Sequence, residues 1–199
     1  MNTLKLYDHP LSGNCYKIRL LLSMLGLEYE RVPVDIRVGE SQSEAFLQLN
    51  PRGQIPVLVD GETVIWDSMA ILVYLARRYG SEAWLPADPL GEARVMQWLA
   101  ISENELIYGL ARARATLVLK RPFNLAQCQR EGQVGLGVLE GRLAESPWLA
   151  GEGVTIADIA CYPYVALATE GEVSLEPYPA VRAWLARVQG LPGWFPMSA

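Results

Sequence analysis

The sequence predicts an α/β domain over residues 1–80, a linker over residues 81–90 and an all-helical domain over residues 91–199. Strand-like and helical patterns alternate in the first part in the order β-α-β-α-β-β-α, which is typical of a mixed sheet with helices packed on it. Pro86 and Pro89 then interrupt the helical periodicity, as in a domain linker. Beyond them no strand pattern is found, so the second domain is predicted to be a helix bundle.

The first half of the α/β domain should contain two strands and two helices. Residues 3–7 alternate between polar and apolar side chains, which indicates a half-buried strand. An amphipathic helix should begin after Ser12, and Gly26 stands where glycine usually follows a helix end. The segment 29–34 has a β-rich composition, and residues 39–50 fit a polar turn followed by a short helix.

The second half of this domain should contain a hairpin and a helix. Val57–Val59 and Thr63–Trp66 flank Asp60-Gly61, a dipeptide typical of tight hairpin turns. Ser68–Tyr79 then places its apolar residues on one helical face, and Gly80 ends the helix.

The helical domain should contain four helices. The predicted ranges are Glu92–Leu119, Leu125–Glu145, Thr155–Ala168 and Tyr178–Val188. Pro163 should kink the third helix because it has no N–H to donate.

Composition excludes several classes of function. The formal net charge is −5 and the 17 basic residues are dispersed, which argues against a nucleic-acid or membrane partner. No apolar stretch is long enough to cross a bilayer, and residues 1–10 already fit a strand and a turn, so no secretory leader is expected. Three cysteines leave one unpaired in any disulfide scheme, which fits a reducing cytoplasm. One histidine and three scattered thiols argue against a tetrahedral zinc cluster.

The first turn with candidate chemistry is Ser12-Gly13-Asn14, where a strand gives way to a helix. A helix N-terminus offers free N–H groups and the positive end of the helix dipole, so it favours an anion. Ser12 could equally serve only as the helix cap.

Two more turns have the same double interpretation. Pro56 directly precedes a strand, where a cis bond would leave the backbone of Ile55 free to pair with an extended peptide, although an ordinary strand start is also possible. Asp67 and Ser68 stand where a strand runs into a helix, so they could cap that helix or bind a ligand carboxylate.

In this order and at these spacings, the motifs resemble those of the glutathione S-transferase superfamily over essentially the whole chain. Ser12, Asn14 and Lys17 look like the N-terminal motif of bacterial members of the theta-like and nu-like kind. Asn50–Leu58 is similar to the family's glutathione-binding loop with its cis-proline, and residues 67–71 resemble its acidic-Ser-x-Ala-Ile element.

The C-terminal domain carries a further match, because residues 153–158 resemble the family's capping motif in a core helix. There the Thr155 hydroxyl should accept the N–H at the third helical position, and the Asp158 carboxylate should accept the N–H of Thr155. The resemblance as a whole implies a thioredoxin-like first domain, glutathione as co-substrate, no metal and a two-fold homodimer.

The resemblance also implies a role for each residue of the three turns. Ser12 would donate a hydrogen bond to the glutathione sulfur as the catalytic hydroxyl, and Asn14 would make a second polar contact near it. Ile55, held by Pro56, would pair through its backbone with the cysteinyl part. The resemblance further implies Asp67 and Ser68 as contacts of the γ-glutamyl end and Gln54 as a contact near the glycyl end. Gln42 is a weaker candidate, because the loop of residues 39–43 has no Lys or His where many relatives place a ligand of the glycyl carboxylate.

Cys15 has two interpretations. Residues 12–15 have the spacing of a C-x-x-C redox motif in which Ser12 replaces the outward nucleophile. We expect Cys15 to be a packed, unreactive thiol, because free cysteines are usually buried.

The second substrate is expected between the domains, against the first helix of the bundle, with Trp98, Tyr108 and Arg112 as candidate contacts. The predicted function is a glutathione transferase that uses the thiolate of glutathione to attack a small electrophile. The alternatives are glutathione-dependent disulfide reduction or peroxide removal, and a non-catalytic scaffold of the same fold.

Overall fold

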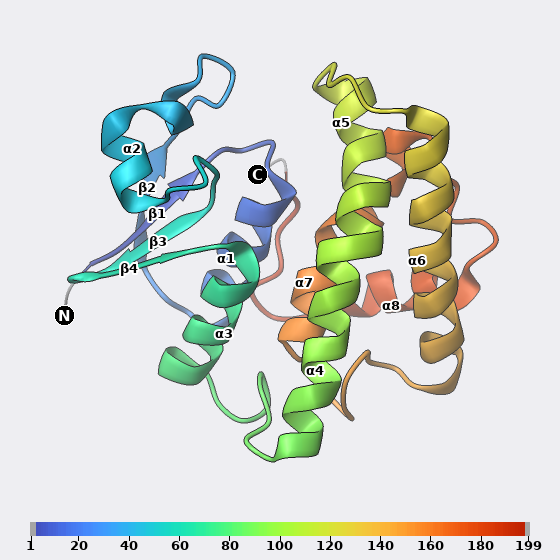
Figure 1. The fold of residues 1–199 in the computed structure, drawn as a ribbon. Coiled ribbons are helices and arrows are strands. Elements are labelled where there is room, and N and C mark those ends of the chain that lie inside the picture. The colour runs from blue at the N-terminus through green and yellow to red at the C-terminus, as the bar shows by residue number, and fades with distance from the viewer. Residues whose placement is uncertain (1–2, 198–199) are drawn as a thin grey trace. The chain divides into compact units, whose positions relative to one another are not determined.

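The computed structural model describes residues 3–197, which form two compact units (Figure 1). The first unit runs to Gly80 and also includes the C-terminal segment from Pro192, whereas the second covers Ser81–Leu191. The predicted helical domain of residues 91–199 therefore extends too far, since its last residues belong with the first unit.

Contacts to helix α1 (Gly13–Met24) explain the place of the C-terminal segment. Ser23 Oγ donates to the carbonyl of Gly193 at 2.7 Å, and the Tyr16 hydroxyl donates to the carbonyl of Phe195. The rings of Tyr16 and Phe195 also meet edge to face, with centroids 5.6 Å apart, an arrangement that aromatic pairs favour. Helical periodicity carries no information about such a return of the chain.

The first unit is built on a four-stranded mixed sheet with the order β2-β1-β3-β4. The strands are β1 (Leu4–Asp8), β2 (Tyr29–Pro33), β3 (Val57–Asp60) and β4 (Thr63–Trp66). Strands β1 and β2 are parallel, whereas β3 is antiparallel to both β1 and β4. The helices of this unit are α1, α2 (Glu44–Leu49) and α3 (Ser68–Tyr79), so the predicted order β-α-β-α-β-β-α is confirmed.

Helices cover both faces of the sheet, with α1 and α3 on one face and α2 on the other (Figure 1). Phe46 of α2 forms a buried cluster with Val34 and Val57, and Tyr7 packs its ring edge to face on Phe46. Alternate residues of β1 are buried, as the period of a strand requires. The last of these is Asp8, a carboxylate at a core position.

The second unit contains a helical run from Pro89 to Val118, followed by three further α-helices and, after the second of these, a short 3-10 helix (Ala168–Gly171). The run consists of α4 (Pro89–Ile101), a π-helical segment (Ser102–Ala111) and α5 (Arg112–Val118). The others are α6 (Leu125–Glu145), α7 (Ile156–Ala166) and α8 (Pro179–Gln189). The run begins inside the predicted linker, because Pro89 is its first residue rather than a breaker and Asp88 caps it.

Glycines allow α6 and the π-helical segment to approach closely. A Cβ on Gly109 would lie 2.2 Å from the backbone nitrogen of Gly132, and a Cβ on Gly135 would lie 2.9 Å from Cβ of Glu105. Neither helix could carry a side chain at these points without moving apart. Gly132 and Gly135 of α6 therefore both lie at the crossing with the π-helical segment.

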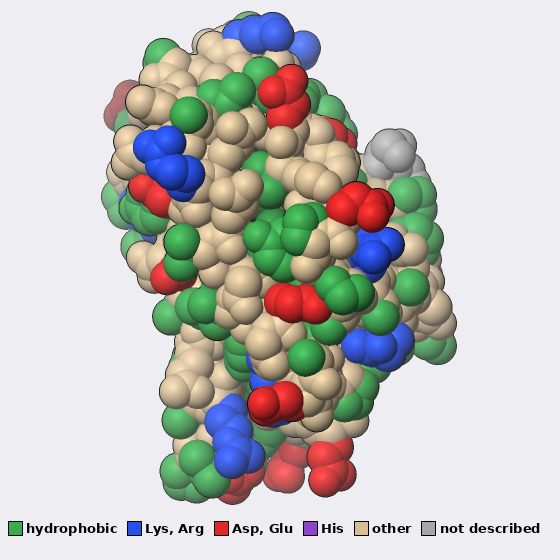
Figure 2. Space-filling view, turned by 90° about the vertical axis from the view of Figure 1, so that its right-hand side faces the viewer, with side chains coloured by type: hydrophobic (Ala, Val, Ile, Leu, Met, Phe, Trp, Pro, Cys, Tyr) green, Lys and Arg blue, Asp and Glu red, His purple; other side chains and the backbone are tan. Residues whose placement is uncertain are grey.

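The surface and helix lengths set further limits. No helix within residues 3–197 is both long and apolar enough to cross a membrane. On the face shown in Figure 2, acidic and basic side chains are interspersed, so this face offers no continuous basic surface of the kind that follows a phosphate backbone.

The predicted capping box at the start of α7 is present and extends further than predicted. Asp158 Oδ2 accepts the N–H of Thr155 at 2.9 Å, and Thr155 Oγ1 accepts the N–H of Ala157 at 3.2 Å. Asp158 Oδ1 also accepts the N–H of Leu149 and the indole N–H of Trp184 at 2.9 Å. Burial raises the pKa of the Asp158 carboxyl, and these donors oppose that shift.

We expect Asp158→Ala to lower the free energy of unfolding by about 3 kcal/mol or more. It leaves the buried N–H groups of Thr155, Leu149 and Trp184 without their acceptor, and each unsatisfied donor costs about 1–3 kcal/mol. Chemical denaturation would measure the change.

Asp88→Ala is the matched control, because Asp88 is an exposed cap whose carboxylate accepts the N–H of Gly91, at 2.8 Å. Its loss should cost about 1 kcal/mol. Equal losses in the two variants would show that the buried network contributes no more than an ordinary cap.

Candidate functional site

The first candidate turn joins β1 to α1 and carries Ser12. Ser12 is the N-cap of α1, and its Oγ accepts the N–H of Cys15 at 3.2 Å. Two hydrogen bonds to His9 close the turn. The Ser12 N–H donates to the carbonyl of His9 at 3.0 Å, and the Leu11 N–H donates to His9 Nδ1 at 3.2 Å. Burial lowers the pKa of His9, in keeping with a neutral ring that accepts this bond. The Ser12 hydroxyl is half-exposed and accepts a bond here, so its own hydrogen can still be donated to a ligand.

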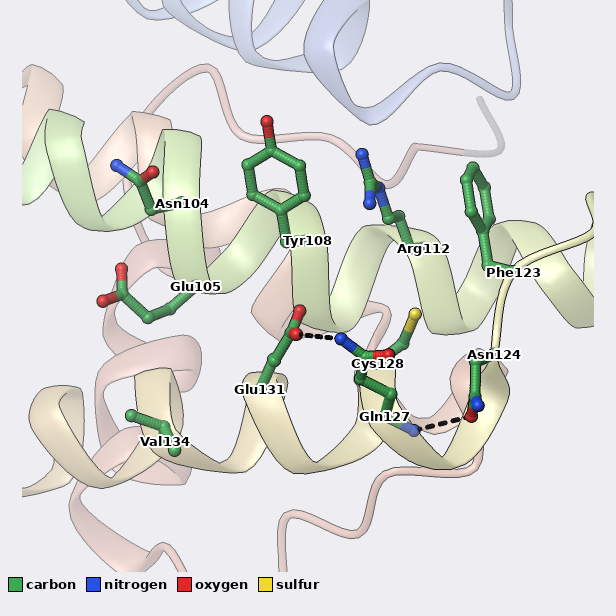
Figure 3. A pocket seen from close by; sticks show the side chains of 10 residues that line it. All are labelled: Asn104, Glu105, Tyr108, Arg112, Phe123, Asn124, Gln127, Cys128, Glu131 and Val134. Carbon is green, nitrogen blue, oxygen red and sulfur yellow. Dashed lines mark hydrogen bonds between the residues drawn. The ribbon is translucent and has the colours of Figure 1, made fainter.

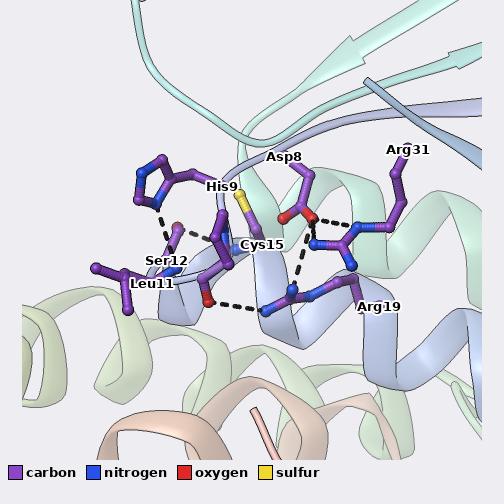
Figure 4. Close-up of polar contacts among 8 residues, drawn as sticks. Asp8, His9, Leu11, Ser12, Cys15, Arg19 and Arg31 are labelled. Carbon is purple, nitrogen blue, oxygen red and sulfur yellow. Dashed lines mark hydrogen bonds and ion pairs between the residues drawn. The ribbon is translucent and has the colours of Figure 1, made fainter. Parts of the chain in front are cut away.

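A buried ion pair between Asp8 and Arg19 lies beneath this turn (Figure 4). Asp8 and Arg19 are each 1% exposed, with Arg19 Nη1 3.5 Å from Asp8 Oδ2. Arg31 donates to the same oxygen through Nε at 2.8 Å and lies 2.5 Å from it through Nη2. Arg19 Nη2 donates to the carbonyl of Pro10 at 3.2 Å, which ties the turn to the interior. This cluster was not predicted from the sequence, although the alternation along β1 points Asp8 inward.

Cys15 lies beneath the turn and has no access to solvent. Burial, together with the charge of Asp8, raises the pKa of its thiol to about 12. A thiol with such a pKa is almost entirely protonated near neutrality and is a poor nucleophile. The expectation of a packed, unreactive Cys15 agrees with this burial.

Asn14 lies on the first turn of α1 and is half-buried. Its Oδ1 is inaccessible to solvent and has no hydrogen-bond partner among the described residues. A buried acceptor without a donor is costly, so this atom is suited to a donor supplied by a ligand.

The second candidate turn precedes β3. The Ile55–Pro56 peptide bond is cis, as the family resemblance implied. Gln42 Nε2 donates to the carbonyl of Gly53 at 2.9 Å, so Gln42 holds this loop in place. The Gln54 side chain is exposed, and the carbonyl of Gln54 accepts a bond from Asn50 Nδ2 at 2.6 Å.

The third candidate turn joins β4 to α3. Asp67 rather than Ser68 caps the helix, since Asp67 Oδ1 accepts the N–H of Met69 at 2.9 Å. The other carboxylate oxygen of Asp67 pairs with Arg52 Nη1 at 3.1 Å. Asp67 has φ = 80°, a positive value that is uncommon outside glycine. Arg52 was not predicted as a site residue, because it stands in the second turn, 15 residues before its partner.

Strand register brings the three turns to one edge of the sheet. Tyr7 of β1 pairs with Val57 of β3, and Val57 pairs with Trp66 of β4. The end of β1, the start of β3 and the end of β4 therefore coincide. Each turn follows or precedes one of these positions, so the polar groups of all three lie along the same edge.

A separate cavity of about 510 Å³ lies within the second unit (Figure 3). Its walls come from the π-helical segment, α5, α6 and the loop before α6; the lining residues are Asn104, Glu105, Tyr108, Arg112, Phe123, Asn124, Gln127, Cys128, Glu131 and Val134. Two of the three candidate contacts for the second substrate, Tyr108 and Arg112, line this cavity. Trp98 does not: it is half-buried, and its carbonyl lies 3.5 Å from Cys161 Sγ. No metal-binding cluster of His, Cys, Asp or Glu occurs within the described part of the chain.

Comparison with known proteins gives consistent matches. The family described as "Glutathione S-transferase, N-terminal domain" matches residues 2–77, and "Glutathione S-transferase, C-terminal domain" matches residues 122–192. The disulfide-bond oxidoreductase YfcG of Escherichia coli is 35% identical, over 94% of this chain and 90% of that protein. Glutathione S-transferase 3 of Zea mays is also 35% identical, over 98% of this chain and 92% of its own length.

Solved structures agree with these matches. A glutathione S-transferase from Pseudomonas fluorescens Pf-5 superimposes with a TM-score of 0.93 and 40% identity, covering 98% of this chain and 99% of that one. A Drosophila mojavensis transferase homologue with bound glutathione has a TM-score of 0.87 and 27% identity, over 96% and 90% of the two chains. With both halves of its sequence and the whole of its fold matched, the chain belongs to the glutathione S-transferase family.

Proposed function

We propose that this chain is a glutathione transferase in which the Ser12 hydroxyl stabilises the glutathione thiolate for attack on a small electrophile. The observation that carries the proposal is the alignment of Tyr7, Val57 and Trp66 across three strands, which brings three polar turns to one edge of the sheet. A γ-linked tripeptide bound along this edge could meet all three turns at once.

The γ-glutamyl end would lie at the start of α3. Ser68 is buried at the first position of α3, at the positive end of the helix dipole, which is a suitable place for the ligand's α-carboxylate. Asp67 already accepts N–H groups of the helix and pairs with Arg52, but a carboxylate has lone pairs left for the ligand's amino group. Arg52 becomes a further candidate for this end.

The rest of the tripeptide would follow the second turn. The backbone of Ile55 makes no hydrogen bond within the described residues, so it can pair with the cysteinyl residue as an added strand would. Gln54 would reach the glycyl end. Gln42 supports this loop through Gly53, so its part in binding would be to hold the loop.

Activation of the thiol needs no general base. Lowering a thiol pKa near 8.5 by two units takes about 2.7 kcal/mol. A hydrogen bond to an anion contributes about 1.5–3 kcal/mol and a helix N-terminus about 0.3–1 kcal/mol. Ser12 at the start of α1 supplies both terms, and the Asn14 side-chain amide lies on the first turn of the same helix.

Glutathione-dependent disulfide reduction is a second candidate, favoured by the similarity to the Escherichia coli disulfide-bond oxidoreductase. The burial of Cys15 argues that both reducing thiols would come from glutathione. One thiolate would attack the disulfide and release a thiol. A second would displace the other half, giving glutathione disulfide. Parallel assays with an aryl halide and a small disulfide would separate the two activities.

We also propose a two-fold homodimer in the cytoplasm. Dimers are implied by the family, and the three cysteines Cys15, Cys128 and Cys161 are buried and form no disulfide, as suits a reducing compartment.

Ser12→Ala should lower kcat/KM for aryl-halide conjugation about ten- to hundred-fold while glutathione affinity changes little. The variant loses the hydrogen bond to the sulfur, so the apparent pKa in the pH profile of kcat/KM should rise toward that of a free thiol. Steady-state kinetics from pH 6 to 9 would measure both effects.

Ser12→Thr is the control, because it keeps a hydroxyl and a helix cap. Thermal unfolding of both variants would account for the cap lost in Ser12→Ala, about 1 kcal/mol. If Ser12→Ala turns over at the wild-type rate, Ser12 is only a cap and Asn14 becomes the first suspect.

Ser68→Ala should weaken glutathione binding about ten-fold and leave kcat nearly unchanged at saturating glutathione. The substitution removes a contact to the γ-glutamyl end, far along the ligand from the reacting sulfur. Titration calorimetry with reduced glutathione would measure the affinity.

Ser23→Ala removes a hydroxyl from the same unit but outside the proposed site, and it should leave the affinity unchanged. An unchanged affinity in Ser68→Ala would remove Ser68 from the site. No heat with the wild-type protein at millimolar glutathione would favour the scaffold alternative.

A further inference from the structure

The cavity of the second unit has two chemically different ends (Figure 3). Arg112, Phe123 and Asn124 lie at one end, and Glu105 and Val134 lie at the other. The cavity therefore combines a cationic, aromatic end with an acidic one.

The Arg112 guanidinium lies between two aromatic rings. Its Cζ is 4.1 Å from the centroid of the Tyr108 ring and 4.9 Å from that of Phe123. Stacking of this kind holds the planar group in one orientation and uses its faces rather than its N–H groups. The N–H groups in the guanidinium plane stay available as donors.

No carboxylate within the described residues forms an ion pair with Arg112, although two acidic residues line the same cavity. Glu131 Oε1 instead accepts a hydrogen bond from Gln127 Nε2 at 2.9 Å. Arg114, two residues further along, differs: it is 5% exposed, and its Nε donates to Glu170 at 2.7 Å. Arg114 thus has a structural partner, whereas Arg112 presents an oriented cation to an open cavity.

We propose that this cavity binds the electrophile and that Arg112 selects substrates carrying a planar anion, specifically aryl halides with a ring carboxylate. A guanidinium fork matches a carboxylate with two parallel hydrogen bonds. The rings of Tyr108 and Phe123 provide an aromatic surface for the aryl group. Glu105 and Glu131 repel an anion from the rest of the cavity, so they favour one orientation of the substrate. This inference rests on the proposed transferase function.

The reaction is a substitution on the aromatic ring. The glutathione thiolate forms a C–S bond to the ring carbon that bears the halogen, and the C–halogen bond breaks with loss of halide. The thiol proton has already passed to solvent. Arg112 contacts the carboxylate of the substrate and takes no part in bond making.

A pair of substrates that differ in charge tests the proposal. 4-Chloro-3-nitrobenzoate and 4-chloro-3-nitrobenzamide have nearly the same shape, and the ratio of their kcat/KM values cancels their intrinsic reactivity when wild type and variants are compared. Arg112→Met should lower the ratio of benzoate to benzamide about ten- to hundred-fold. Arg112→Lys, which keeps the charge but loses the planar fork, should lower it less.

Arg130→Met is the matched control, since Arg130 is an exposed arginine of α6 outside the cavity lining. It should leave the ratio unchanged, which separates a specific contact from general attraction of anions. Inhibition by the unreactive 3-nitrobenzoate, compared with 3-nitrobenzamide, gives a second readout. Thermal unfolding shows whether each variant is folded. If Arg112→Met does not fold, the comparison is made with Arg112→Lys alone.

An equal ratio in wild type and the Arg112 variants, with both substrates conjugated, overturns this inference and leaves the transferase proposal intact. If the wild type conjugates the benzamide but not the benzoate, the inference about Arg112 is likewise overturned and the transferase proposal stands. Absence of conjugation with either substrate, together with no heat on adding glutathione, overturns the transferase proposal itself.

Discussion

Hydrogen-bond register between β1, β3 and β4 is the constraint on which the proposed glutathione site depends. Because side chains alternate along a strand, a slip of one residue would turn every core residue of that strand toward the opposite face. The buried residues Leu6 and Leu58 lie directly opposite each other and resist such a slip. The same packing that stabilises the sheet therefore determines which turns meet at its edge. The relative positions of the groups that would bind glutathione thus depend on the core.

The turn that carries Ser12 has an unusual support. An aspartate and an arginine that are both fully buried are costly to desolvate, and such pairs often add little to stability. Here Arg19 also binds the carbonyl of Pro10, and Arg31 reaches Asp8 from the neighbouring strand. The charges thus join β1, β2, α1 and the turn in one network. An apolar pair could fill the same space, but it could not bind a backbone carbonyl.

Much of the fold and part of the site could be predicted from the sequence, because those features depend on local contacts. Ser12 as a cap, the hairpin at Asp60-Gly61 and the Thr155–Asp158 box each involve residues within a few positions of one another. The missed features all involve distant residues: Arg52 with Asp67, Arg19 with Asp8, and the return of the C-terminal segment to α1. Periodicity identifies the faces of a helix, but not the partner that each face meets.

The contacts of Tyr16 and Ser23 with the last residues of the chain have a consequence for biosynthesis. Synthesis proceeds from the N-terminus, and domains generally fold as units while the chain emerges. In this chain the sheet and its helices are translated first, yet one side of α1 receives its partners only after every helix of the bundle has been made. The first unit can therefore be complete only after the second unit has been synthesised.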